Sequence, residues 1–194
     1  DNIKKVDKAS NGKIGYIYIP DMGPEGLNEF SRYFYPQLDK EGLIIDDRAN
    51  GGGNVSPMIL ERLSREPYRL TMRRGSARIG TVPDAVQVGP KVCLINKYSA
   101  SDGDLFPWGF RALGLGKLIG TRTWGGIVGI SGSLPYMDGT DIRVPFFTSF
   151  DPKTGSWIIE NHGVDPDILI DNDPVKEWNG EDQQLDRAIQ EVMK

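Results

Sequence analysis

The stretch KVCLINKYSASDGDLFPWGFRAL, residues 91–113, indicates the fold class because it joins a strand, a turn and a helix directly. Lys91–Lys97 is an apolar run of the kind that forms a buried strand. The polar turn Ser99–Asp104 follows it, and the predicted helix Asp104–Leu113 has to begin close to Pro107 or kink there. A strand that runs through a short turn into a helix is the building unit of α/β proteins.

Two similar units precede this one along the chain. The strand Lys13–Pro20 is followed by the helix Gly26–Leu38, and the strand Gly42–Arg48 by the helix Ser56–Glu66. Three such units in succession predict an α/β fold with a mostly parallel sheet. A C-terminal β-rich segment of short strands follows, in which Asp138–Gly139 is a hairpin turn signal. The last helix is predicted from an apolar stripe of Leu185, Ala188, Ile189 and Val192.

Composition limits the classes of function. The 194 residues are 38% hydrophobic, which is enough for one sizeable core. The formal net charge is only −4, so nucleic acid is not an expected partner. No apolar run approaches the ~18 residues that a membrane span needs, and no membrane partner is expected. The single Cys93 excludes an internal disulfide and a cysteine-based metal site, and the single His162 argues against a histidine-rich metal centre. No metal or cofactor is expected.

The first candidate site is the loop NGGGN, Asn50–Asn54, at the end of the strand Gly42–Arg48. Strand ends are where α/β sheets usually build their sites. Consecutive glycines let the backbone approach a ligand closely and expose its N–H groups. They could cradle a phosphate, although the spacing fits neither common phosphate motif and no lysine is placed for one. They could instead form half of an oxyanion hole, or only a tight turn.

The other two candidates are the turn Ser99–Asp104 and the segment Ile158–Ile168. Ser101 leads into a helix N-terminus, where free amides favour negative charge, so it is either a nucleophile or an ordinary helix cap. Glu160 could orient a base, and His162 is the only imidazole in the chain. In a strand the two side chains would point the same way. The alternative is a surface histidine with no catalytic role.

Taken together, these loops resemble the tricorn proteases, relatives of the C-terminal processing (tail-specific) serine proteases. The resemblance implies a crotonase/ClpP-like fold, a spiral of ββα units. It rests on five motifs in the family's order, which are IGYIYIPDMGPEGLNEF (Ile14–Phe30), D-R-x-N-G-G-G (Asp47–Gly53), S-D-G-D (Ser101–Asp104), LGLGKLIGTRTWGG (Leu113–Gly126) and ENHGVDPD (Glu160–Asp167).

The resemblance implies a serine peptidase that hydrolyses short peptides through an acyl-enzyme. Ser101, which immediately precedes Asp102, matches the nucleophile. The backbone N–H groups of Gly53 and Asp102 match the oxyanion hole, and Glu160 matches the glutamate of the catalytic tetrad. Possible substrate-binding residues are Gly51, Gly52, Leu70 and Gly126.

The resemblance leaves the chain without its general base. The tail-specific branch uses a lysine, and Gly126 occupies its place here. The tricorn branch uses a histidine, preceded by a serine, in a domain before the PDZ domain. His162 falls where other members carry a different residue, so it is only an alternative base. The chain on its own is therefore expected to be inactive or nearly so.

The resemblance also assigns residues 13–194 to the C-terminal core domain of a larger parent with upstream PDZ and base-bearing domains, and residues 1–12 to a linker. The expected partners are peptide substrates, those upstream domains, and further copies in a homo-oligomer such as a hexamer. It implies a cytoplasmic location, with export as the alternative. In archaeal tricorn an acidic residue a little upstream of Arg-Arg-Gly helps to select basic side chains, but Arg69–Met72, which precede Arg73-Arg74-Gly75 here, include none. An apolar or relaxed cleavage preference is expected instead of a basic one. The competing hypothesis is a non-catalytic peptide-binding or ligand-binding module on the same fold.

Overall fold

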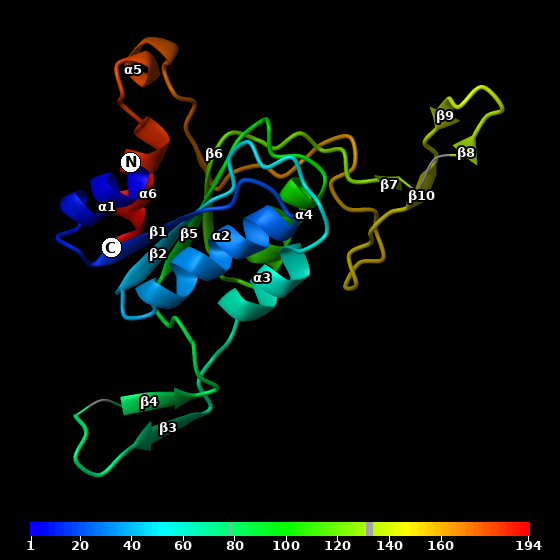
Figure 1. The fold of residues 1–194 in the computed structure, drawn as a ribbon. Helices are drawn as coiled ribbons and strands as arrows, with labels where there is room; N and C mark the ends of the chain where they lie inside the picture. Colours follow the sequence, from blue (N-terminus) through cyan, green and yellow to red (C-terminus); the bar gives the residue numbers. More distant parts are fainter. Residues whose placement is uncertain (78, 131–133) are drawn as a thin grey trace.

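A five-stranded parallel sheet forms the centre of the computed structural model, which describes residues 1–77, 79–130 and 134–194 (Figure 1). Its strands are β1 (Ile14–Tyr18), β2 (Gly42–Asp46), β5 (Lys91–Ile95), β6 (Gly116–Gly120) and β11 (Ile168–Leu169). Their order is β1-β2-β5-β6-β11, and every neighbouring pair is parallel. The predicted α/β class with a mostly parallel sheet is confirmed.

Helices cover both faces of the sheet. They are α1 (Asn2–Ala9), α2 (Pro24–Phe34) with the 3-10 turn η1 (Tyr35–Gln37), α3 (Ser56–Leu63), α4 (Asp102–Ala112) and α6 (Gln183–Val192). The short helix α5 (Pro174–Trp178) has no buried residue and covers neither face. One core lies under α2, α3 and α4, and a second lies under α1 and α6 (Figure 1). Successive side chains of a strand point to opposite faces, so Leu43 and Ile45 of β2 enter the first core and Ile44 enters the second.

The four predicted helices are all present, as α2 with η1, α3, α4 and α6. The apolar stripe of α6 is buried against the sheet. Helix α4 begins at Asp102, and Pro107 lies inside it, where the ring removes one N–H from the helical hydrogen-bond series. Phe106 and Phe110 of α4 are fully buried in the first core, so packing compensates for that loss.

Residues 1–12, predicted to be a linker, instead contain α1, and this prediction needs correction. Val6 is fully buried in the second core, beside Ile14 and Tyr16 of β1. Ser10 ends the helix, and its hydroxyl accepts the N–H of Ile14 at 3.1 Å. Only one apolar side chain of this segment is buried, so its sequence shows no apolar stripe that would predict a helix. The sheet supplies the surface on which that side chain packs. Where a separate domain begins stays a prediction.

Two excursions leave the sheet (Figure 1). The hairpin of β3 (Arg69–Met72) and β4 (Ile79–Val82) lies between α3 and β5. An arm follows β6 and contains β7 (Gly129–Ile130), β8 (Leu134–Pro135), β9 (Asp141–Ile142) and β10 (Pro145–Phe147). The predicted turn at Asp138–Gly139 joins β8 to β9, with Gly139 at a φ of 82°. The predicted C-terminal β-rich segment begins at Lys117, but its first residues form β6 of the central parallel sheet. This arm therefore matches only the later part of that prediction.

Parallel strands bring the loops that follow them to one edge of the sheet. The loops after β2, β5 and β6 therefore meet at the carboxyl edge, whereas the β3–β4 hairpin joins the end of α3 to the start of β5 at the amino edge. None of the helices within the described ranges is both long and apolar enough to cross a membrane.

Candidate active site

Ser101 occupies a strained position between β5 and α4. Its φ of 57° and ψ of −119° are uncommon for a residue with a side chain. It is exposed at the N-cap of α4, yet its side chain makes no capping hydrogen bond. The ordinary cap considered from the sequence is therefore not what the hydroxyl does. An exposed hydroxyl on a tight turn from strand to helix is the arrangement of a serine nucleophile.

The glycine loop after β2 lies directly against this turn. Gly52 has a φ of 95°, and a Cβ added there would lie 2.7 Å from Ser101 Cβ and 2.9 Å from the backbone nitrogen of Asp102. Gly53 has a φ of 151°, and a Cβ there would collide with the backbone of Met22. Both positions require glycine, because of the backbone conformation and because backbone atoms fill the space.

Two backbone N–H groups of this turn and the adjoining glycine loop have no hydrogen-bond partner among the described residues. Within the described residues, the amides of Gly53 and Asp102 donate to no other group. Asp102 follows the serine in sequence, and Gly53 follows the glycine that touches it. Paired free amides beside a nucleophile are what an oxyanion hole requires. The positions predicted from the sequence are thus brought together.

Asn50 holds the two loops together, and the sequence reasoning did not single it out. Its side-chain nitrogen donates to the carbonyl of Ile19 at 3.1 Å, and its side-chain oxygen accepts the N–H of Gly52 at 2.9 Å. Its own carbonyl accepts the N–H of Ala100 at 2.8 Å. The residue is fully buried. The only signal in the sequence was its place just before three glycines.

Glu160 is held by the loop that follows β6. Its Oε2 accepts the N–H of Ile127 at 2.7 Å and the N–H of Val128 at 2.9 Å. Two backbone donors fix the orientation of this carboxylate and leave its other oxygen for a further partner. Glu160 therefore has the well-defined position that a group orienting a base needs.

The same loop is attached to the serine turn. The N–H of Trp124 donates to the carbonyl of Ser99 at 2.9 Å, and the N–H of Gly125 donates to Asp104 Oδ1 at 2.8 Å. Residues 124–128 therefore connect the turn that carries Ser101 with the carboxylate of Glu160. Gly126 lies in this connection.

The remaining predicted residues are less close to this arrangement. The imidazole Nε2 of His162 lies 2.7 Å from Asp165 Oδ2, and both side chains are more than half exposed. Gly51 lies in the exposed part of the glycine loop, with open space around it. Leu70 lies on β3, in the hairpin at the amino edge, so the structure does not bring it together with the others (Figure 1).

Four buried aspartates lie beneath the loops, namely Asp46, Asp47, Asp102 and Asp104. Asp102 accepts the N–H of Ser56 at 3.0 Å and also its hydroxyl. Asp47 is fully buried, and neither of its oxygens has a hydrogen-bond partner among the described residues. Burial raises the pKa of Asp47 well above its usual range, and the nearby charges of Asp46 and Asp104 raise it further. Within the described ranges, no three Asp, Glu, His or Cys side chains are arranged to hold a metal.

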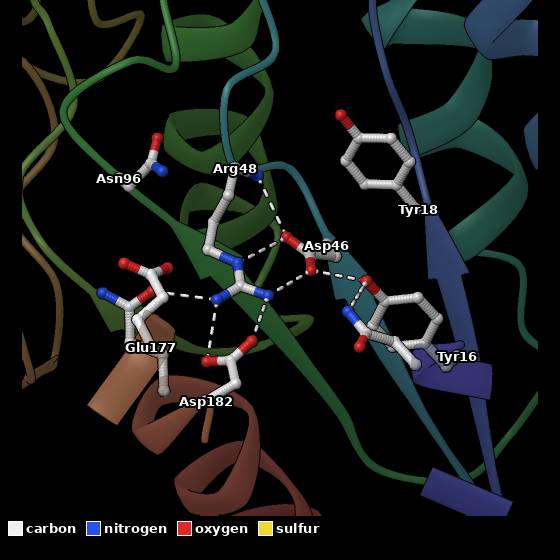
Figure 2. A pocket seen from close by; sticks show the side chains of 9 residues that line it. Tyr16, Tyr18, Asp46, Arg48, Asn96, Glu177 and Asp182 are labelled. Carbon is white, nitrogen blue, oxygen red and sulfur yellow. Dashed lines mark hydrogen bonds and ion pairs between the residues drawn. The ribbon is translucent and has the colours of Figure 1, made fainter. Parts of the chain in front are cut away.

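Arg48, next to Asp47, joins the end of β2 to the C-terminal helix (Figure 2). Its Nη2 lies 2.6 Å from Asp46 Oδ2 and 2.8 Å from Asp182 Oδ2. The hydroxyl of Tyr16 donates to the same Asp46 oxygen at 2.6 Å. These groups line a polar cavity of about 350 Å³. Because both carboxylates are already paired with the guanidinium, we interpret this cluster as a structural joint that fixes the start of the glycine loop.

Comparisons with known proteins agree with this geometry. The sequence matches the family described as Peptidase family S41 over residues 13–170. It is 46% identical to the tricorn protease of Thermoplasma volcanium over 195 residues, covering 99% of this chain and 18% of the relative. Tricorn protease homolog 1 of Streptomyces coelicolor is 38% identical, over 95% of this chain and 17% of the relative. The crystal structure of the tricorn protease matches with a TM-score of 0.90 and 42% identity, over 100% of this chain and 19% of that one. The chain thus spans less than a fifth of the length of these relatives.

Proposed function

Because this chain belongs to peptidase family S41, we propose that it is the nucleophile-bearing domain of a serine peptidase of the tricorn type. One observation carries this proposal: Ser101 stands exposed at a strained turn against the glycine loop, and the amides of Asp102 in the turn and Gly53 in the loop have no partner among the described residues. A binding module would need neither the strained serine nor the two free amides. The finer arrangement of the ββα units as a spiral is also proposed by resemblance.

The reaction would be acyl transfer to Ser101. Its Oγ attacks the carbonyl carbon of a peptide bond while a base takes the hydroxyl proton. The amides of Gly53 and Asp102 stabilise the negative charge on the tetrahedral oxygen. The base returns its proton to the leaving amine, and water then attacks the ester, which frees Ser101 and the acid product.

The base would come from outside this chain. The imidazole of His162 is paired with Asp165. By the resemblance, Gly126 takes the place of the lysine of the tail-specific branch. We therefore propose a histidine supplied by an upstream domain of a longer protein, with Glu160 ordering its hydrogen bonds. Short peptides would be the substrates, and a homo-oligomer the working form.

Hydrolysis of a mixed pool of short fluorogenic peptides tests this function. Four samples would be compared: this chain, the longer protein, the longer protein with Ser101→Ala, and the longer protein with Ser64→Ala. Ser64 is a matched control, because its exposed hydroxyl only donates to the carbonyl of Glu61. Activity in the longer protein and the control, but not in the other two samples, is the expected result.

Two other outcomes would change the proposal. If this chain alone is active and Ser101→Ala abolishes that activity, the base lies within these residues and His162 is the first candidate. If Ser101→Ala leaves the activity of the longer protein intact, Ser101 is not the nucleophile and the binding module becomes the better hypothesis.

A further inference from the structure

The acyl-transfer scheme leaves one buried carboxylate of the serine helix without a role. Asp104 is the third residue of α4, one turn after Ser101, and is fully buried. Its Oδ1 accepts the N–H of Gly125 at 2.8 Å, and its Oδ2 makes no hydrogen bond of good geometry within the described residues. Burying a carboxylate costs free energy unless its partners are well placed, so an apolar side chain would serve packing better here.

Donors from two loops surround this carboxylate. Burial raises the pKa of Asp104, while the hydroxyl of Thr123 and the backbone N–H groups of Gly125, Ser101 and Gly126 lower it. The hydrogen bond from Gly125 to Asp104 Oδ1 connects α4 to the loop after β6.

The other end of the same loop holds Glu160. Only a few residues separate Gly125, bound to Asp104, from Ile127 and Val128, which donate to Glu160. Gly125 has little room to move, because its carbonyl accepts the N–H of Asn161 at 2.7 Å. Its φ is 89°, and a Cβ there would meet the neighbouring backbone. A segment this short and constrained transmits a shift at Gly125 to the amides that hold Glu160.

We propose that Asp104 is a positioning residue that sets where Glu160 lies relative to Ser101, acting through the backbone of residues 125–128. The inference rests on the proposed function, because it assigns Glu160 a catalytic task. Asp104 acts as a hydrogen-bond acceptor for Gly125, and an asparagine oxygen can accept the same N–H. Asp104→Asn should therefore keep Glu160 in its position relative to Ser101, and Asp104→Ala should release it.

Amide hydrogen exchange on this chain tests whether Asp104 holds residues 125–128, and through them Glu160, in place. In Asp104→Ala we expect the amides of Gly125, Ile127 and Val128 to exchange about tenfold faster, because the segment loses its anchor. In Asp104→Asn, and in the exposed control Asp138→Ala, their rates should stay within about threefold of the wild type. The amide of Ser56, held by Asp102, reports on the rest of the site and should not change. Faster exchange at Gly125 alone, or equally at Ser56, would overturn the proposal.

The catalytic part is tested in the longer protein with a double-mutant cycle. Asp104→Ala alone should lower kcat by about tenfold or more and change KM little, because it misplaces a group that acts in the transition state. In a Glu160→Gln background the same substitution should cost less than about threefold, because the two changes break one connection. Additive losses would overturn the proposal. If the longer protein shows no peptidase activity, the proposed function fails, while the exchange experiment still decides whether Asp104 controls the position of Glu160.

Discussion

Removing the Asn50 side chain should weaken both the fold and the oxyanion hole. Asn50→Ala breaks two hydrogen bonds, one to the carbonyl of Ile19 and one from the N–H of Gly52. The Ile19 carbonyl is buried, so leaving it unpaired costs about 1–3 kcal/mol. The Gly52 amide is partly accessible to water, so its loss costs about 1 kcal/mol.

The free energy of unfolding should therefore fall by about 2–4 kcal/mol. With an m-value of about 2–3 kcal/mol/M for a domain of this size, the urea midpoint drops by about 1 M. The four tryptophans make intrinsic fluorescence a suitable probe of unfolding. In the longer protein, the displaced Gly53 amide should lower kcat by up to ~10²–10³-fold, the cost of losing one oxyanion donor.

Asn96→Ala is the matched control. The side chain of Asn96, like that of Asn50, makes two hydrogen bonds to the backbone: its oxygen accepts the N–H groups of Ala49 and Tyr98 at 2.9 and 3.1 Å. Both bonds are exposed, so water replaces them and the loss should stay below about 1 kcal/mol. Equal losses for Asn50→Ala and Asn96→Ala would refute the reasoning that burial makes Asn50 the anchor of the two loops.

Three further predictions concern the same region. Gly53→Ala should lower the free energy of unfolding, measured in urea, by at least about 2 kcal/mol and abolish peptidase activity. The added Cβ would collide with the backbone of Met22, and φ at this position is positive. A stable, active variant would contradict this prediction. The pKa of Asp47 is higher in the folded than in the unfolded chain. Protonated Asp47 therefore adds to the stability of the fold at a pH below its ordinary pKa, and this contribution is lost as the pH rises through the pKa of the folded chain. Asp47→Asn should therefore be more stable than the wild type at pH 8, with the gain shrinking toward pH 4 in thermal unfolding; a gain independent of pH would argue against a raised pKa. His162→Ala removes an exposed side chain paired only with Asp165, so kcat/KM of the longer protein should change less than about threefold, and a loss of tenfold or more would make His162 a participant.

Local patterns predicted three of the five strands of the sheet, β1, β2 and β5, and the loops at its carboxyl edge. Apolar runs such as Lys91–Lys97 and the helical stripe of α6 each depend on neighbours within one element, and that is the range over which periodicity carries information. The three glycines and the Ser-Asp turn are also local signals. For the glycines, the backbone conformation at Gly52 and Gly53 excludes other residues. Helix α1 was missed because its one buried residue, Val6, depends on a surface that the sheet supplies.

The contacts that make these loops one site depend on residues far apart in the sequence. Gly125 and Asp104 are separated by 21 positions, and Ile127 and Glu160 by 33, and neither pair has a pattern that marks it. Leu70 shows that closeness in sequence does not ensure closeness in space. Its segment follows the glycine loop along the chain but lies at the opposite edge of the sheet. A chain's periodicity specifies which face of each element is buried, but hydrogen bonds between loops form only after packing has fixed the distances between those elements. For this reason the residue types of the site could be predicted from the sequence, whereas the connection from Ser101 through Asp104 to Glu160 appears only in the folded chain.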